Sequence, residues 1–590
     1  MPQFLKSLLA SCLGIFIAFA LLFGIGSIAI GRMVASADQP KPVKPNSVLH
    51  LTFKDAIPEQ TNNLEIDPFA FNKDNTLGLT AITAAIGRAA EDDRIKGVFL
   101  EPDMLLSTGL ATNKVIHDAL LKFKESGKFV VAYSNYYVQG AYYLAATADE
   151  VWLNPLGIVD FRGFSSQIPF FKDMLDRVGV NMQVYYAGKF KGATEPYRFN
   201  ELSEENRLQI RTYLDDIYAD FLSDLSADRG IEDSQLRALA NAYTGMDPEA
   251  ALDAGLIDGL GHRDVAISAL RERLGLDSDE KIPQIGLTDY AKSNPVEKDY
   301  SVKDKIAIIY AEGAIVDGKA NPGTIGDKDY TSYIKEARED ERVKALVLRV
   351  NSPGGSAMAS ENIWREIRLT QEAGKPVVVS MGDYAASGGY YISASADSIF
   401  AEPNTLTGSI GVFSLIPDAS ELLEENMGIH FDTVKTGAFS LGITPFHPMS
   451  AAESQLLQAR TEQMYETFLS RVSEGRGMSR DDVHEIAQGR VWTGSRGVGI
   501  GLVDAIGGLS RALQAAASLA DLEAYRTTEY PRVKDPIQQI LEEFMGEESV
   551  RSKAILRSEL GTYYPYYEYA KQMSGTKSPQ ARLPFLISTQ

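Results

Sequence analysis

Short apolar runs alternate with segments of helical periodicity along both halves of the chain. Each half shows an apolar run, a helical pattern and a second apolar run, in the same order. These segments are Ile95–Leu100, 111–126 and Phe129–Tyr133 in the first half, and Val343–Val350, 361–372 and Val377–Ser380 in the second. Strands that alternate with helices predict β-β-α or βαβ units around buried sheets. The pattern therefore indicates an α/β protein.

The two halves also match residue by residue, which indicates a duplicated domain. Residues 140–149 match residues 388–397, an offset of 248 (388 minus 140). Farther on, Gly188–Pro196 pairs with Gly437–Pro445 at an offset of 249 (437 minus 188). A chain of 590 residues exceeds what one hydrophobic core supports. We therefore expect two copies of one fold, each with its own core.

The repeats divide the chain into four segments. They are a membrane anchor with a Pro-rich spacer (1–45), a first repeat (46–290), a second repeat (304–535) and a C-terminal tail (536–590). The polar stretch Asp289–Lys303 is the expected linker between the repeats. The tail has no partner in the first copy. Packing is the simplest explanation of its Tyr-rich cluster 563–567, and a partner surface or a membrane-facing patch stays open.

The N-terminal segment predicts a membrane anchor. Leu8–Ile30 contains 23 residues and no charge, and a helix of that length reaches roughly 30 Å, enough to cross a bilayer core. Ala35-Ser-Ala37 offers a cleavage site, so a cleaved signal is the alternative to a retained anchor. The single cysteine, Cys12, lies in this segment. The remainder of the chain therefore has no disulfide, thiol nucleophile or cysteine metal cluster.

Charge and motif content exclude several classes of function. The net charge of −21 argues against a nucleic-acid partner, because phosphate binding requires a basic surface. No His-Glu-x-x-His sequence, paired cysteines or clustered histidines are present, so we expect no metal site. The glycine-rich stretches lack the Gly-Lys-Ser/Thr sequence of a phosphate loop, and we expect no cofactor.

Ser387 is the candidate nucleophile. It lies in Ala385-Ala-Ser-Gly-Gly389, at an expected turn from a strand into a small-residue helix, where backbone N–H groups can face an oxyanion. A helix-capping serine is the structural alternative, but the first copy has Gln139 in this position. The loop ending in Gly355 also follows a strand and offers a second oxyanion donor. The corresponding first-copy stretch 103–107 contains no glycine.

A serine nucleophile needs a base, and lysine is the stronger candidate type here. The six histidines are scattered outside the repeated motifs: His50, His117, His262, His430, His447 and His484. A Ser-His-Asp arrangement is therefore possible but unsupported. A lysine can act as a base when burial lowers its pKa. Lys191 lies among small and apolar neighbours, with Lys189 as its local competitor, and the second copy has Ser440 in place of Lys191.

The motifs closely resemble the long, duplicated form of the signal peptide peptidase A (protease IV) family of Ser/Lys peptidases. The resemblance covers the anchor and both repeats in order. Its most specific stretches are Gly188–Pro196, Ala385–Gly389, Leu406-Thr-Gly-Ser-Ile-Gly411 and Gly489-Arg-Val-Trp-Thr-Gly494. The resemblance implies tandem domains of the Clp-protease/crotonase-type fold behind an N-terminal transmembrane helix.

The family resemblance also implies a role for each candidate residue. Ser387 matches the nucleophile and Lys191 the general base, while Ser409 matches a serine that hydrogen-bonds the lysine. Gly388 and Gly355 match the oxyanion positions. Gly192 stands where the family often has a serine, which leaves the assignment of the base intact. The first copy would then supply the base, and the second copy the nucleophile and oxyanion hole.

The implied substrates are signal peptides and other hydrophobic peptides, cleaved in the envelope of a bacterium. The resemblance places a single-pass protein in the inner membrane, with its catalytic domains on the periplasmic side, and implies a homotetramer. Two other functions stay open: a crotonase-like acyl-CoA enzyme, and a non-catalytic membrane scaffold. The sequence leaves undecided whether Lys191 meets Ser387 within one chain or between chains.

Overall fold

The computed structural model describes residues 40–53, 56–63, 76–102, 109–296, 299–532 and 580–582, together with Gly14. The expected anchor, the first-copy loop 103–107 and most of the C-terminal tail, including its Tyr-rich cluster, lie outside the described residues. Within the described part of the chain, no helix combines the length and the apolar character that a membrane span requires.

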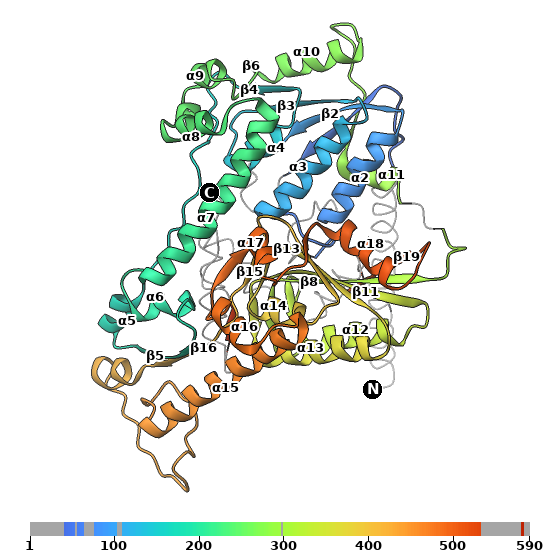
Figure 1. Cartoon of the computed structure of the whole chain (residues 1–590). Coiled ribbons are helices and arrows are strands. Elements are labelled where there is room, and N and C mark those ends of the chain that lie inside the picture. The colour runs from blue at the N-terminus through green and yellow to red at the C-terminus, as the bar shows by residue number, and fades with distance from the viewer. Residues whose placement is uncertain are drawn as a thin grey trace, which may run out of the picture.

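The first half is built on a six-stranded parallel sheet (Figure 1). Its strands, in spatial order, are β6 (Gly259–Leu260), β4 (Glu150–Leu153), β3 (Phe129–Ser134), β2 (Ile95–Glu101), β1 (Ser47–Thr52) and β7 (Gln284–Gly286). Helices α2 (Leu79–Glu91), α3 (Leu110–Lys124) and α4 (Gln139–Ala145) cover one face. Helix α10 (Arg263–Leu274) covers the other face.

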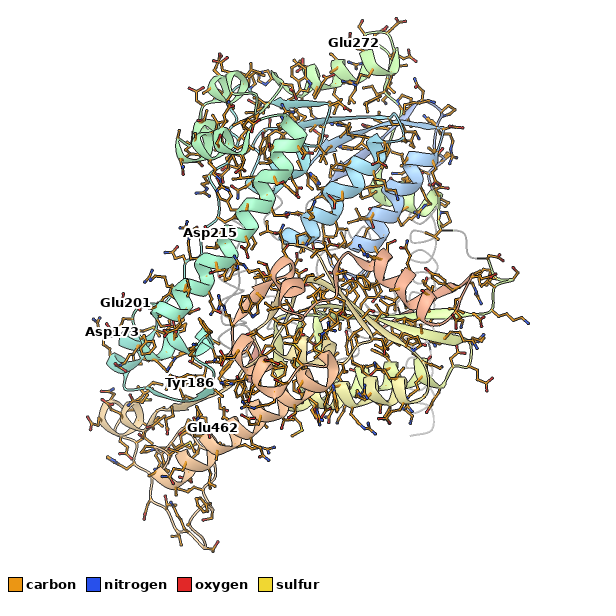
Figure 2. The ribbon with its side chains drawn as sticks, in the orientation of Figure 1. Asp173, Tyr186, Glu201, Asp215, Glu272 and Glu462 are labelled. Carbon is orange, nitrogen blue, oxygen red and sulfur yellow. The ribbon has the colours of Figure 1, made fainter. Side chains whose placement is uncertain are left out.

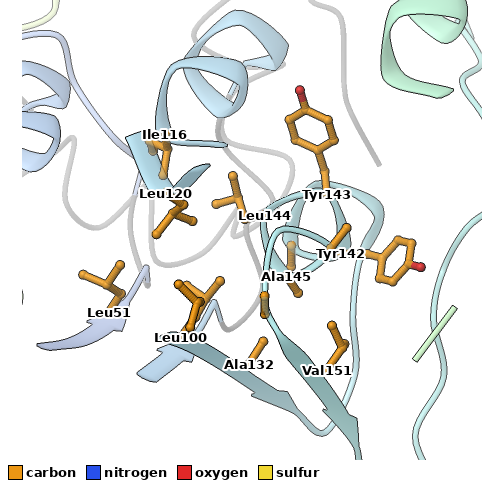
Figure 3. Packing of buried hydrophobic residues seen from close by; sticks show 14 of the residues in the cluster. Leu51, Leu100, Ile116, Leu120, Ala132, Tyr142, Tyr143, Leu144, Ala145 and Val151 are labelled. Atoms are coloured by element: carbon orange, nitrogen blue, oxygen red, sulfur yellow. The ribbon is translucent and has the colours of Figure 1, made fainter. Parts of the chain in front are cut away.

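Alternation of side chains along the strands explains the two covered faces. On β2, Leu100 points to the side of α3 and α4, where it joins Ile116 and Tyr142 in the larger core (Figure 3). The neighbouring Phe99 points to the opposite side and packs with Leu270 of α10. Successive strand residues face opposite sides of a sheet, so a strand buried on both faces is apolar throughout.

The second half repeats this architecture. Its sheet has the spatial order β17 (Val491–Thr493), β15 (Leu406–Gly408), β13 (Val377–Ala386), β11 (Val343–Ser352), β8 (Lys305–Glu312) and β19 (Arg526–Tyr530), with β14 (Ser398–Ala401) and β18 (Ala505–Ile506) continuing from β13. Helices α12 (Asp327–Glu339), α13 (Ala357–Glu372) and α14 (Gly388–Ser393) cover one face, and α18 (Leu509–Leu519) covers the other. The α/β class and the duplication are thereby confirmed.

A third sheet joins the two halves. Its order is β10 (Thr324–Gly326), β9 (Ala314–Val316), β12 (Gly354–Ser356), β20 (Gln580–Arg582), β16 (Val412–Asp418) and β5 (Asn181–Ala187). Strand β5 belongs to the first copy and pairs antiparallel with β16 of the second copy. We call the first-copy segment 172–198 the base arm; it contains α5 (Lys172–Val178), β5, the 3-10 turn Gly192–Thr194 and α6 (Glu195–Arg198).

Two long helices anchor the equivalent arms in the two copies. Helices α7 (Glu204–Arg229) and α15 (Ala451–Arg476) have 26 residues each, and each begins with a capping serine and ends at a glycine in the left-handed conformation. In Figure 1, α7 runs from the first-half sheet down to α6. The remaining helices are α8 (Asp233–Asn241), α9 (Pro248–Asp253), α11 (Leu287–Ser293), α16 (Arg480–Ile486) and α17 (Gly494–Gly499), with short turns at Thr244–Met246 and Leu422–Asn426.

The linker differs from the sequence-based expectation. The polar stretch Asp289–Lys303 was expected to connect the copies, but α11 extends to Ser293. Tyr290 of this helix is buried in the first core and donates a hydrogen bond to Asp92. Tyr290, together with the contacts of Asp289 and Ser293 to Lys41, therefore holds the first part of this polar stretch against the first copy.

Candidate active site

Ser387 lies at a strained turn between β13 and α14. Its backbone has φ 57° and ψ −116°, outside the regions that residues other than glycine normally adopt. The turn is held by a hydrogen bond from the Ser387 N–H to the Gly408 carbonyl, 2.7 Å long. The Ser387 hydroxyl makes no capping hydrogen bond to α14. The helix-capping alternative is therefore wrong, and the buried hydroxyl is free to meet another group.

That group is Lys191. Its Nζ lies 2.9 Å from Ser387 Oγ, 3.0 Å from Ser409 Oγ and 3.0 Å from the Ser409 carbonyl oxygen. The lysine is 1% exposed, and its three hydrogen-bond partners are neutral. Burial lowers the pKa of the Lys191 ammonium well below its usual 10.5, because no opposite charge compensates the lost hydration. A neutral amine beside a hydroxyl can accept the hydroxyl proton.

The base arm carries Lys191 into the second copy. The pairing of β5 with β16 ends at Ala187, and the Phe190 N–H then donates to the carbonyl of Gln488. Gly489 is essential for this approach, since a Cβ there would lie 2.7 Å from the backbone nitrogen of Lys191. Figure 2 shows the outer part of this junction, where Tyr186 of β5 lies near Glu462 of α15.

The competing bases lie elsewhere. Lys189 is exposed, and its Nζ lies over the ring of Phe190 at 5.3 Å from the centroid. Four of the six histidines have side-chain partners among the described contacts: His50 with Glu101, His117 with Asp118 and Asp228, His447 with Thr433, and His484 with Tyr465. The structure thus favours Lys191 over Lys189, and among the described hydrogen bonds none joins a histidine to Ser387.

Two glycine-containing segments near Ser387 are candidates for the backbone N–H groups that bind an oxyanion. Gly388 opens α14, where the first N–H groups have no partner within the helix. Gly355 lies on β12, and a Cβ there would come within 2.0 Å of the Ile315 carbonyl oxygen. Gly389 allows α14 to approach Ser352, whose carbonyl oxygen would be 2.6 Å from an added Cβ. Close backbone packing therefore requires glycine on both sides of the nucleophile.

The chain's own C-terminal strand lies beside these groups. Strand β20 pairs antiparallel with β12, with Ala581 opposite Gly355, and contacts β16 through Gln580 opposite Phe413. It also contacts α14, the helix that follows Ser387. Strand β20 thus lies between β12 and β16, and an extended peptide inserted into a sheet binds in this manner. The tail has no counterpart in the first copy, and the sequence contains no local signal for this pairing.

In the first copy, Gln139 occupies the position equivalent to Ser387, and its side chain is bound to backbone groups. The Gln139 side chain accepts hydrogen bonds from the backbone N–H groups of Arg162 and Gly163 and donates one to the Gly163 carbonyl. Phe161 occupies the position of Ser409, 248 residues earlier (409 minus 161). The sequence-based comparison of the copies did not include this difference, although the 248-residue offset aligns Phe161 with Ser409. Ser440, the counterpart of Lys191, lies on an exposed loop.

In the comparison with known proteins, one family model matches both copies. The family model described as Peptidase family S49 matches twice, over residues 122–277 and 370–523. The first match contains Lys191 and the second contains Ser387 and Ser409. The two matches together cover more than half of the chain.

Two relatives match most of this chain, and a third matches about a third of it. Protease 4 of Haemophilus influenzae is 37% identical over 451 residues, which cover 75% of this chain and 72% of the relative. The chloroplastic serine protease SPPA of Arabidopsis thaliana is 35% identical over 81% of this chain and 70% of the relative. A putative signal peptide peptidase SppA of Enterococcus faecium is 37% identical over 34% of this chain and 60% of the relative.

The state of Lys191 predicts a pH dependence of Ser387 reactivity. A fluorophosphonate probe should phosphonylate Ser387, with loss of fluoride, faster as pH rises, because deprotonation of Lys191 creates the base. The midpoint should lie well below 10.5, the usual pKa of lysine. Lys191→Arg should abolish labelling, because a guanidinium stays charged. Mass spectrometry of the labelled peptide measures both effects; a midpoint near 10.5 would contradict the assignment.

Proposed function

Because this chain belongs to peptidase family S49 and is therefore a serine peptidase, we propose that it cleaves signal peptides with Ser387 as nucleophile and Lys191 as general base. One contact carries the proposal: the buried Lys191 amine lies 2.9 Å from the Ser387 hydroxyl oxygen within a single chain. Its partners are neutral, which favours the unprotonated amine that a base requires.

The geometry supports a two-step acyl transfer. Neutral Lys191 accepts the proton of Ser387 as Oγ attacks the peptide carbonyl, and the N–H groups of Gly388 and Gly355 stabilise the oxyanion. Lys191 then gives the proton to the leaving amine, and an acyl-enzyme remains. Water then transfers a proton to Lys191 as it attacks the ester, and Lys191 returns that proton to Ser387 Oγ when the second product leaves. Ser409 holds the amine in line through its hydroxyl and carbonyl oxygens.

The substrate is an apolar peptide bound in an extended conformation. Strand β20 supports this mode, because it lies antiparallel to the strand that contains Gly355. The name of the Enterococcus relative supports signal peptides as the substrate class. An anchor over 8–30 in the inner membrane, with the catalytic domains on the periplasmic side, would place the site beside such peptides. We also assign both copies to the Clp-protease/crotonase-type fold.

The two alternative functions fit this site less well. Crotonase-like acyl-CoA enzymes use an oxyanion hole without a serine nucleophile, and a buried Lys191 beside Ser387 would have no role in them. A non-catalytic scaffold would not need the strained backbone of Ser387, which costs of order 1–3 kcal/mol in comparable cases. Both alternatives also conflict with the serine peptidase family to which the chain belongs.

We further propose that the protein forms a closed homotetramer, in which a segment of one chain pairs as a strand with a segment of the next chain. Within one chain, β5 of the first copy pairs with β16 of the second. The repeat offsets place their counterparts at 430–436 and 164–170, and neither segment is in a strand. We call residues 421–447, which correspond to the base arm at an offset of 249, the second arm. Its apolar residues that are 36% or more exposed include Ile429, Phe431, Val434, Phe439, Ile443 and Phe446. This arm projects at the lower left of Figure 1.

A second copy of the chain is the matching partner for this arm. If 430–436 of one molecule pairs with 164–170 of the next, the junction repeats the β5–β16 contact in trans. Such a heterologous contact generates a ring when the rotation closes. The arm would then bring Ser440, the counterpart of Lys191, to the site that contains Gln139, the counterpart of Ser387. This second junction would serve assembly and not catalysis.

Substitution of the two proposed catalytic residues tests the function. Purified full-length protein in detergent should hydrolyse an apolar signal peptide, and Ser387→Ala or Lys191→Ala should lower kcat by at least about 1000-fold. Lys189→Ala is the matched control and should retain the wild-type rate, because Lys189 is exposed. Chromatography of the products measures the rates. Equal activity of Ser387→Ala and wild type would refute the mechanism.

Release of β20 should accelerate cleavage, because a substrate must otherwise displace it. Ala581→Pro removes a backbone N–H from the strand and should raise kcat/KM several-fold, mainly through a lower KM. Ala581→Ser retains the N–H and should behave as wild type. Initial rates at low peptide concentration measure the effect. Identical kinetics for the proline and serine variants would show that β20 does not compete with substrate.

A charge on the exposed arm should disrupt the assembly. Val434 is 99% exposed in one chain, and Val434→Asp should reduce the molar mass measured by light scattering from a tetramer to smaller species. Val296→Asp provides the control, because Val296 is 58% exposed but lies outside the arm. Labelling of Ser387 should persist in both variants, since Lys191 comes from the same chain. An unchanged tetramer in Val434→Asp would exclude this interface.

A further inference from the structure

An irregularity in β13 lies immediately before the nucleophile. Strands β11 and β13 pair regularly up to Val350 opposite Met381, and pairing resumes at Ser352 opposite Ala385. One residue of β11 therefore faces three residues of β13, Gly382 to Tyr384. β-bulges redirect the chain and recur beside active sites. Here the bulge determines the direction in which β13 enters the turn at Ser387.

The side chain of Asn351 replaces the missing ladder contacts. Its Oδ1 accepts a hydrogen bond from the Tyr384 N–H at 3.1 Å, and its Nδ2 donates to Glu59 Oε1 at 3.1 Å. Its carbonyl oxygen accepts from the Gly313 N–H. Asn351 thus links the bulge to the strand that continues into the loop with Gly355. The same residue also contacts the first copy, because Glu59 comes from there.

Glu59 of the first copy contacts the residues around the bulge. It is 2% exposed and forms a bidentate ion pair with the equally buried Arg349, at 2.8 and 3.0 Å. Arg349 in turn donates to Ser380 Oγ and to the Met381 carbonyl, the last regular positions before the bulge. Gly382 makes room for the carboxylate, since a Cβ there would lie 2.5 Å from Glu59 Oε1.

A second contact from the first copy holds the bulge at Asp383. Helix α3 begins at Gly109 without a capping side chain of its own. Asp383 supplies the cap from the other copy, accepting hydrogen bonds from the Thr112 N–H at 2.9 Å and the Thr112 hydroxyl at 2.7 Å. A carboxylate at a helix N-terminus is favoured by the helix dipole. A Cβ at Gly109 would overlap the Asp383 carboxyl, so glycine is required there.

We propose that Glu59 and Thr112 of the first copy are positioning residues for the reaction at Ser387. Through Arg349, Asn351 and Asp383 they fix the bulge, and the bulge sets the nucleophile turn against the oxyanion strand. The inference rests on the proposed catalytic role of Ser387. It gives the first copy a second contribution besides Lys191: the first copy also holds the geometry of the group that Lys191 activates.

Three variants and one control test this role by peptide hydrolysis. Thr112→Val retains the backbone donor but loses the hydroxyl, and Glu59→Gln removes the charge at nearly constant shape. Each should lower kcat about 10- to 100-fold with little change in KM, because small displacements of reacting groups have effects of this size. Thr112→Ser should restore kcat. Asp216→Asn removes another bidentate pair between the copies, with Arg496, and should leave kcat unchanged.

Two further measurements separate positioning from loss of stability. Thermal melting identifies the temperature range in which each variant is folded, and kinetics are compared within that range. The pH midpoint of Ser387 labelling should stay at the wild-type value, because these substitutions leave the contacts of Lys191 in place. If Glu59→Gln does not fold at any assay temperature, the Thr112→Val and Thr112→Ser pair decides.

Two outcomes would overturn the proposal. One is a wild-type kcat in folded Thr112→Val and Glu59→Gln. The other is an equal loss of kcat in Asp216→Asn, which would indicate a general effect of weakening the contact between copies. If wild type labels at Ser387 but does not hydrolyse peptides, the proposed function fails. The labelling rates of the same variants would then still decide whether Glu59 and Thr112 position Ser387.

Discussion

Desolvation of the Lys191 amine is the constraint on which the site depends. A lysine in water is protonated near neutral pH and cannot accept a proton. Burial without a carboxylate partner removes that obstacle, and the contacts at Nζ are the oxygens of Ser387 and Ser409. An acidic neighbour would stabilise the ammonium and raise its pKa, which would destroy the base. The protein must therefore hold a polar amine in a dry site with neutral oxygens only.

The duplication provides that dry site, because each copy covers groups of the other. Lys191 comes from the first copy, but Ser409 and the backbone of Gln488 and Gly489 belong to the second. The amine is desolvated only when the copies pack together, so folding of the whole chain and the base strength of Lys191 are coupled. The filled first-copy position at Gln139 fits this division, since a second nucleophile there would have no base.

Local patterns predict the repeat, the sheets and the candidate residues, but not the contacts between copies. The strand runs and the 248-residue offset are periodic or repeated signals, and the structure reproduces them in both halves. The same offset could have revealed Phe161 opposite Ser409. In contrast, the Glu59–Arg349 pair joins residues 290 positions apart, and β20 pairs with β12 without any matching motif. These contacts depend on how two folded units pack, which no local spacing encodes.

The short segment from Asp383 to Ser387 shows why the packing of the copies matters for reactivity. The first copy holds its beginning through Thr112 and its end through Lys191. Between these points the chain passes from a bulge into a backbone conformation that is unfavourable for serine. Such strain persists only where surrounding contacts over-determine it. Fixing both ends of five residues leaves the turn few ways to relax, so the hydroxyl stays directed at the base rather than at the N-terminus of α14.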